Sequence, residues 1–272
     1  MDTRDQAQLE QLIQSVLESS KYRAISLDLI RNVGLRELSV RRNLKEAIKA
    51  TKNKLHQVAG AYLDGKPQYA PWTELLTTAA QSGEPQDLRQ ACLAIMQHHA
   101  STRERIELLD RFYTTILAGL PPIRSVLDVA CGLNPLSIPW MPLDRGASYY
   151  ACDIFSDQMA FVDSCLPHLG VAGRAFTCDL VSAPPQEPVD VAFAFKVLPP
   201  LEQIDKSSSL NLLRALNTNT IIVSFPARSL GGRNKGMAEN YESRFLPMVQ
   251  AEQWQVERFD FPTELVFRVA KS

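Results

Sequence analysis

The feature that most constrains the fold of this chain is an apolar run, residues 125–129, that leads into the small-residue turn Ala130-Cys131-Gly132. Val and Leu dominate the run, which is typical of a strand buried within a parallel sheet. The small residues after it would let the backbone approach a ligand closely. Ligands of open α/β sheets bind beyond the carboxyl ends of the strands, so the stretch predicts a ligand site just after Asp128.

A second strand and an acidic residue follow at the spacing of a nucleoside-binding unit. Residues 149–154 are predicted to form the strand, and Asp153 comes 21 residues after Gly132. A carboxylate about 20 residues past a glycine loop can accept hydrogen bonds from both ribose hydroxyls. Gly132 alone is as often part of an ordinary turn as of a ligand-binding loop, because the dinucleotide fingerprint has three glycines. Asp153 is therefore what favours a nucleoside site.

Strands and helices alternate through the rest of the carboxyl-terminal part. Strands are predicted at 175–180, 189–198 and 219–226, helices at 157–169, 208–216 and 238–252, and two closing strands at 254–261 and 264–270. This alternation predicts an α/β doubly wound sheet. With its closing hairpin it resembles the class I S-adenosylmethionine (SAM)-dependent methyltransferases, which have a Rossmann-like, seven-stranded, mostly parallel sheet. Before residue 120 the pattern is all helical, including predicted helices at 5–19, after Ser26 or Asp28, and at 39–59.

Composition excludes several other classes. The chain has 272 residues, enough for one large or two modest domains, and no apolar run long enough to span a membrane. Its start is polar and lacks a signal-peptide core. The five cysteines form no CxxC pair, so we expect reduced thiols, a cytoplasmic protein and no metal site.

The amino-terminal part is strongly basic although the whole chain has a net charge of −1. Between Lys21 and Gly60 there are ten Lys and Arg residues against three acids, a net charge of +7. A basic region in a charge-balanced protein indicates a local anionic partner, with nucleic acid the first candidate. The alternative is a solvated helical face with no partner.

Several segments together carry a more specific resemblance. They are Lys21-Tyr-Arg23, Lys54-Leu-His-Gln-Val-Ala-Gly-Ala-Tyr62, His99-Ala-Ser-Thr-Arg-Glu-Arg105, Asp128-Val-Ala-Cys-Gly-Leu-Asn-Pro135 and Ser224-Phe-Pro-Ala-Arg-Ser-Leu-Gly-Gly-Arg-Asn-Lys-Gly-Met237. In this order, over nearly the whole chain, they resemble the aminoglycoside-resistance 16S rRNA (guanine-N7) methyltransferases of the Arm and FmrO type, which act on guanine 1405. The resemblance implies a helical docking region for the ribosome at 1–104 and a SAM-dependent methyltransferase domain at 105–272.

The resemblance also implies roles for individual residues. Arg105 would bind the methionine carboxylate of SAM, Asp153 the ribose, and Asp179 with Leu180 the adenine. The full implied cofactor set is Tyr62, His99, Ala100, Ser101, Arg105, Ala130, Gly132, Asp153, Ile154, Asp179, Leu180 and Phe195. Lys196, Arg228 and Lys235 would position the guanine, and Lys21, Arg23, Lys52 and Lys54 would bind RNA. The sequence departs from the family near Ile204, where a Gln is common, and at Thr263–Phe267.

The implied chemistry needs no general base. Guanine N7 has a lone pair and no proton, so it can attack the sulfonium methyl group directly, with catalysis by proximity and orientation. N7 lies in the deep major groove of A-form RNA, so the base must be flipped out or the helix distorted. We expect the partner to be 16S rRNA in the assembled 30S subunit and the enzyme to be a monomer.

Two alternatives stay open from the sequence. A SAM-dependent small-molecule methyltransferase would use the helical region as a lid, which leaves its basic charge unexplained. A non-catalytic protein of the same fold would bind RNA without using SAM.

Overall fold

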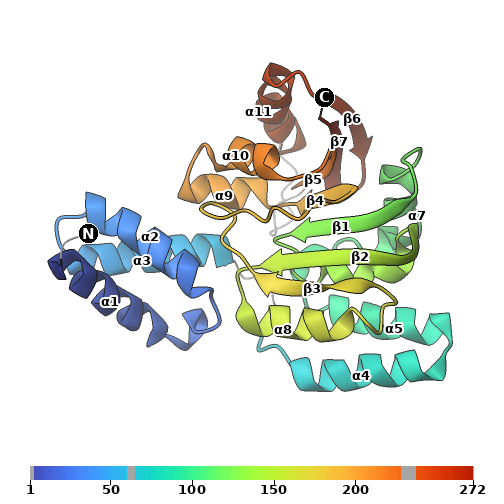
Figure 1. Ribbon diagram of the computed structural model, residues 1–272, viewed down its shortest axis with the longest axis horizontal. Coiled ribbons are helices and arrows are strands. Elements are labelled where there is room, and N and C mark those ends of the chain that lie inside the picture. Colours follow the sequence, from blue (N-terminus) through green and yellow to red (C-terminus); the bar gives the residue numbers. More distant parts are fainter. Residues whose placement is uncertain (1–2, 60–64, 228–236, 272) are drawn as a thin grey trace.

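The computed structural model describes residues 3–59, 65–227 and 237–271 and shows two regions joined side by side (Figure 1). The amino-terminal region is a bundle of three helices, α1 (Thr3–Leu17), α2 (Leu27–Val40) and α3 (Leu44–Ala59). Apolar side chains spaced three and four residues apart form its core, among them Leu12, Val16, Ile30 and Leu55. We call this region the amino-terminal bundle.

The larger region is built on a seven-stranded sheet with the strand order β3-β2-β1-β4-β5-β7-β6. The first five strands in the chain are parallel, and β7 runs antiparallel to β5 and β6. Their bounds are β1 (Ile123–Val129), β2 (Leu143–Asp153), β3 (Ala172–Thr177), β4 (Val191–Phe195), β5 (Thr220–Pro226), β6 (Gln255–Asp260) and β7 (Glu264–Ala270). The predicted fold class, a mostly parallel α/β sheet with an amino-terminal helical region, is confirmed.

Helices cover both faces of this sheet. On one face are α4 (Tyr69–Ser82), α5 (Pro85–Met96), α7 (Leu109–Ile116) and α8 (Ser156–Cys165), and on the other are α9 (Leu198–Ile204), α10 (Ser208–Ala215) and α11 (Met237–Ala251) (Figure 1). Short helices precede α7, namely α6 (Ala100–Arg103) and a 3₁₀ turn at Ile106–Leu108. The strands in the centre, β1 and β4, are buried on both sides, as their continuous apolar runs predict.

The amino-terminal bundle differs from prediction in one respect. The helix expected at 39–59 is present but begins later than predicted, because α2 extends to Val40 and α3 begins at Leu44. Arg41 has extended backbone angles, and the Asn43 side chain accepts a hydrogen bond from the Glu46 N–H at 2.9 Å. Asn43 therefore acts as an amino-terminal cap for α3, a local signal stronger than the helical periodicity around it.

Two strands end earlier than predicted, and both differences shape the ligand site. β3 ends at Thr177, so Asp179 lies in the loop beyond the strand rather than within it. β4 ends at Phe195 because Lys196 has φ +55°, and the prolines that follow begin α9. Both Asp179 and Lys196 are thereby placed past the carboxyl edge of the sheet.

Candidate functional site

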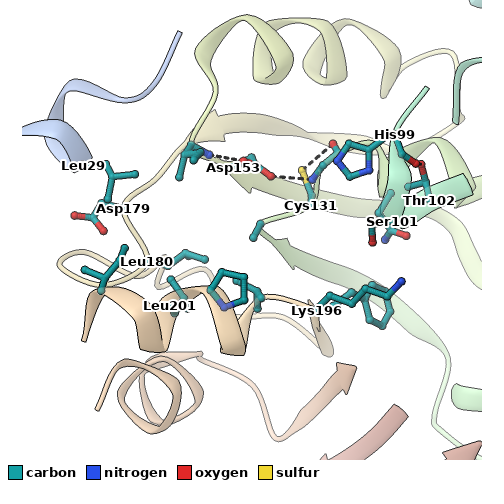
Figure 2. Close-up of a pocket in the computed structure, with 18 of the residues that line it drawn as sticks. Leu29, His99, Ser101, Thr102, Cys131, Asp153, Asp179, Leu180, Lys196 and Leu201 are labelled. Carbon is teal, nitrogen blue, oxygen red and sulfur yellow. Dashed lines mark hydrogen bonds between the residues drawn. The ribbon is translucent and has the colours of Figure 1, made fainter. Parts of the chain in front are cut away.

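A pocket lies at the carboxyl ends of β1, β2 and β4, where the sequence predicts a ligand site (Figure 2). It holds about 820 Å³ of empty space, part of which is open to solvent. Its lining residues come from α2, from residues 99–105 in and around α6 (the α6 segment), from the carboxyl ends of the strands and the loops after them, and from α9. They are Leu29, His99, Ser101, Thr102, Arg105, Ala130, Cys131, Gly132, Asn134, Asp153, Ile154, Asp179, Leu180, Phe195, Lys196, Val197, Pro200, Leu201 and Ile204.

The turn after β1 forms the floor of the pocket in a backbone conformation that most residues avoid. Gly132 has φ +54°, and a Cβ atom there would come within 2.7 Å of the His99 ring. Ala130 has φ +50° without being a glycine. Such strain persists where the surrounding structure imposes it, often at a ligand site. The conformation leaves the backbone open to close approach by a ligand.

Asp153 is held in place by the same turn. Its two carboxylate oxygens accept hydrogen bonds from the N–H groups of Gly132 at 2.9 Å and Ile154 at 2.6 Å. Burial raises the pKa of Asp153, and these two N–H groups oppose that rise. Each oxygen keeps a second lone pair, so the carboxylate can still accept hydrogen bonds from a ligand diol.

Arg105 is the largest polar side chain in the buried wall, with 1% of its surface exposed. Its Nε and Nη2 donate to the two carboxylate oxygens of Glu264 at 2.9 and 2.5 Å, and Nη1 donates to Asn134 at 2.5 Å. Phe112 and Phe195 stack against the guanidinium, at 4.6 and 4.4 Å from their ring centres. A guanidinium has five N–H groups, so donors remain that can face the pocket.

The Arg105 and Glu264 charges stabilise one another. Burial would raise the pKa of Glu264, but Arg105 and Lys196 outweigh burial and lower it. Burial likewise would lower the pKa of Arg105, and Glu264 raises it above its usual value. Ser224 also donates to Glu264, at 2.7 Å. The pair therefore stays ionised and fixes the direction of the guanidinium.

Lys196 lines the pocket, and its position is also fixed. Its Nζ donates to Glu104 at 2.6 Å and lies 4.0 Å from Glu264. The residue is 8% exposed and has the left-handed φ described above. The ammonium is thereby directed toward the α6 segment, next to the His99–Ser101 side of the pocket (Figure 2).

Behind the pocket lies a second polar network centred on Asp128. Asn134 and Tyr149 both donate to one oxygen of Asp128, at 2.9 and 2.8 Å, while Oδ1 has no hydrogen-bond partner among the described residues. Burial raises the pKa of Asp128 to about 7 against these hydrogen bonds. Asn134 accepts from Tyr113 and Arg105, so the network joins Asp128 to the guanidinium.

Most of the predicted cofactor residues are brought together in this pocket. His99, Ser101, Arg105, Ala130, Gly132, Asp153, Ile154, Asp179, Leu180 and Phe195 line it, as does the predicted guanine-positioning residue Lys196. Ala100 is buried in α6 without lining it. Tyr62, Arg228 and Lys235 lie outside the described residues.

Sequence reasoning missed other residues at the site. Glu264 and Glu104 hold the two cations, and Leu29, Cys131, Leu201 and Ile204 add apolar wall. One signal was available for Glu264, since it opens an otherwise apolar strand, Glu264–Ala270, where an acid requires a buried partner. Nothing local to Leu29 or Ile204 indicates that the pocket includes them.

The predicted RNA-binding residues lie in the amino-terminal bundle and the turn after α1. The Lys21 ammonium is 2.6 Å from His56 Nδ1 of α3, and the Tyr22 hydroxyl donates to the Lys52 carbonyl. Arg23 donates to the Leu17 carbonyl. Lys54 forms an ion pair of 3.1 Å with Glu37, whose side chain is 2% exposed. The segment that carries Lys21 therefore packs against α3 near Lys52, whereas the Lys54 side chain points toward Glu37 of α2.

Two further features bear on the function. No group of His, Cys, Asp and Glu side chains with the arrangement of a metal site occurs within residues 3–59, 65–227 and 237–271. All five cysteines are reduced, as predicted. In the same described ranges, no helix is both long and apolar enough to cross a bilayer.

Comparison with known proteins identifies the family. The family described as "Ribosomal RNA methyltransferase (FmrO)" matches residues 18–268. A 16S rRNA (guanine(1405)-N(7))-methyltransferase of Micromonospora echinospora is 35% identical over 97% of both chains, and one of Serratia marcescens is 37% identical over 95% of this chain and 96% of its own. The crystal structure of the 16S rRNA methyltransferase RmtF with S-adenosyl-L-homocysteine is 32% identical over both full chains, with a TM-score of 0.81.

The resemblance read from the sequence motifs is confirmed by these matches, which cover the helical amino-terminal part as well as the sheet. The 16S rRNA methylase RmtB also matches, at 29% identity over 97% of this chain and 98% of its own, with a TM-score of 0.75. The chain therefore belongs to the FmrO family of ribosomal RNA methyltransferases.

Proposed function

We propose that this protein transfers the methyl group of SAM to N7 of guanine 1405 in 16S rRNA, in the cytoplasm, acting as a monomer on the assembled 30S subunit. The resulting methyl group would block 4,6-disubstituted deoxystreptamine aminoglycosides, giving resistance. One observation carries the proposal: residues of the two family motifs at 99–105 and 128–135 converge with Asp153, Asp179 and Lys196 on one pocket at the carboxyl edge of the sheet. The names of the full-length relatives support the target nucleotide.

The residues of the pocket fit SAM. Asp153 would accept the ribose hydroxyls, Arg105 would face the methionine carboxylate, and Asp179 would accept the adenine amino group beside Leu180. The fit rests on the Asp153 carboxylate, whose oxygens keep lone pairs for a diol beside the hydrogen bonds from the Gly132 and Ile154 N–H groups. When bound, SAM supplies an electrophilic methyl group; the protein's task is to hold its two polar ends apart and orient them.

Orientation then carries the catalysis. N7 keeps its lone pair without losing a proton, so a general base has no role, and geometry can supply the rate enhancement. Lys196 lines the pocket, and its ammonium is held by Glu104. From there it would position the flipped guanine through O6 or an adjacent phosphate. Arg228 and Lys235, outside the described residues, complete the proposed guanine-positioning set.

The docking surface is proposed to lie on α3, within the docking region 1–104, with the methyltransferase domain at 105–272. Lys45, Lys49, Lys52 and His56 recur at intervals of three and four residues, so they share one helix face. Lys45, Lys49 and His56 are exposed, and Lys21 adds its charge beside His56. The lysines of this face span about 10 Å from Lys45 to Lys52, from the 1.5 Å rise per residue, and such a row suits an RNA backbone.

The test is methylation of purified 30S subunits with tritiated SAM. Borohydride reduction and aniline then cleave the RNA at N7-methylguanine, and primer extension maps the cleaved nucleotide. We expect a stop at guanine 1405, little transfer to naked 16S rRNA and none to free nucleosides. Transfer to a small molecule with no rRNA product would favour the lid alternative. SAM binding without any transfer to subunits would favour a non-catalytic RNA-binding protein.

A further inference from the structure

The amino-terminal bundle forms part of the pocket wall, although it is far from the sheet motifs in sequence. Leu29 of α2 lines the pocket beside Asp179, and Figure 2 shows the two residues together at one end, with His99 and Ser101 at the other. Leu29 is 2% exposed and belongs to the core of the bundle. Ile204 of α9 belongs to the same core and lines the same pocket.

Backbone hydrogen bonds fasten the bundle to the segment after Asp153. Ser26 N–H donates to the Ile154 carbonyl, and Ser156 N–H donates to the Ala24 carbonyl, both at 2.7 Å. These bonds flank an isolated antiparallel bridge between Ile25 and Phe155. The start of α2 is therefore tied to the residue that follows the ribose-binding carboxylate.

One side-chain contact reaches from α2 to the adenine end of the site. Asn32 Nδ2 donates to Asp179 Oδ2 at 2.8 Å, and the other oxygen accepts from the Val181 N–H at 3.0 Å. Asp179 is 4% exposed and lies in a loop beyond β3, where no strand fixes its side chain. Asn32 and Val181 together set the plane of the carboxylate.

We propose that Asn32 is a positioning residue for cofactor recognition: it orients Asp179 toward the adenine amino group and thereby couples the amino-terminal bundle to cofactor binding. This rests on the proposed function, which assigns the adenine to Asp179. The carboxylate oxygen that Asn32 engages has a second lone pair for the amino group. Because coupling is reciprocal, a bound cofactor also strengthens the attachment of α2 and the presentation of α3.

The test compares two probes that differ at position 6 of the purine, the group Asp179 would recognise, and in whether N1 carries a hydrogen. S-Adenosylhomocysteine carries the 6-amino group, and S-inosylhomocysteine carries a carbonyl oxygen there. Calorimetry on the full chain should show that the wild type prefers the adenosine compound. Asn32→Ala should weaken binding of that compound about tenfold and leave the inosine compound unchanged. Asn53→Ala, at an exposed asparagine of α3, is the matched control.

A second variant and a second readout guard against misfolding. Asn32→Asp keeps the size of the side chain but replaces the donor with a charged acceptor, and should lose the same preference. Hydrogen exchange should show that S-adenosylhomocysteine protects the amides of α2 in the wild type and not in Asn32→Asp. Equal weakening of both probes in both variants, or no weakening, would overturn the inference, because it would reduce Asn32 to a structural residue.

The Asp179→Ala variant separates this inference from the proposed function. If Asp179→Ala abolishes the preference and Asn32→Ala does not, the coupling alone is wrong. If Asp179→Ala keeps the preference, the adenine assignment is wrong and the inference falls with it. Methylation of 30S subunits by the wild type tests the enzyme's activity independently of both results.

Discussion

The charged residues of the pocket and those of the amino-terminal bundle differ in their surroundings and in the roles we expect of them. The side chains of Arg105 and Glu264 are 1% and 0% exposed and form a bidentate ion pair in the buried wall of the pocket. Lys45 and Lys49 on α3 are exposed. A buried charge is costly without its partner, whereas an exposed charge is already solvated and acts mainly on distant partners. Loss of a pocket charge should therefore affect folding, and loss of a bundle charge should affect association.

The largest expected effect is on the buried pair. Glu264→Ala leaves the Arg105 guanidinium buried without its counter-charge, which should lower the free energy of unfolding by about 3–5 kcal/mol. Urea denaturation followed by circular dichroism measures it. The matched control is Glu252→Ala, which breaks the surface pair of Glu252 with Arg214 and should leave the unfolding curve nearly unchanged. An equal loss of unfolding free energy in the two variants would contradict the view that only the buried pair is needed for folding.

The same pair shows where sequence reasoning ends. Glu264 and Arg105 are 159 residues apart, and Lys196 and Glu104 are 92 apart. No local pattern connects such residues, because the first contact depends on how β7 is inserted beside β5 and the second on how α6 packs at the end of β4. The turn after β1 was predictable for the opposite reason: its apolar run, its glycine and the distance to Asp153 are all local or fixed by one strand–helix–strand unit.

The amino-terminal bundle also has features that the sequence alone could not predict. Its helical nature and charge were clear from periodicity and composition, but a +7 segment does not say which cations share a face. The cap at Asn43 sets where α3 begins. Glu37 forms ion pairs with Arg41 and Lys54, so these two cations are less available to an external partner. The contribution of Leu29 to the pocket depends on docking of the whole bundle, which no motif encodes.

A second prediction uses the titration of the buried network. The pKa of Asp128 is about 7 in the folded protein, above its ordinary value, so the folded state keeps this proton longer than the unfolded state. The stability that this supplies is fully present below about pH 4 and is lost as pH rises to about 7. The change should amount to at most about 4 kcal/mol.

Comparison with Asp128→Asn isolates that contribution, because asparagine does not titrate. The difference in free energy of unfolding between the wild type and the variant should favour the wild type most at pH 4–5 and shrink by pH 8. Urea melts at both pH values provide the measurement. A difference that does not change with pH would show that Asp128 does not take up a proton in this range.

The third prediction concerns ligand binding rather than folding. Asp153→Ala removes the charged acceptor proposed for the ribose hydroxyls, which should cost about 1.5–3 kcal/mol of SAM affinity. Calorimetry measures this, with Asp157→Ala on the neighbouring exposed turn of α8 as the control. Wild-type affinity in Asp153→Ala would refute the assignment of the ribose to this carboxylate.

A fourth prediction tests the bundle as a docking surface. Lys45→Ala with Lys49→Ala should leave the unfolding curve and SAM affinity unchanged but weaken binding to 30S subunits. Each lost phosphate contact should lower the slope of log affinity against log salt by about one, giving a change of about two. Binding measured at several salt concentrations gives the slope. Arg145→Ala, near the start of β2 at the opposite edge of the sheet, should leave it unchanged.

The smallest expected effect separates two lysines that are two residues apart. Lys52 shares the α3 face with Lys45, whereas the ammonium of Lys54 is 3.1 Å from the buried Glu37 carboxylate on the α2 side. Lys52→Ala should therefore lower the salt slope of subunit binding by about one. Lys54→Ala should leave that slope unchanged and slightly destabilise the bundle, since Arg41 still pairs with Glu37 at 2.7 Å. If the two variants change the slope equally, the docking surface is the charge of the bundle as a whole rather than one face of α3.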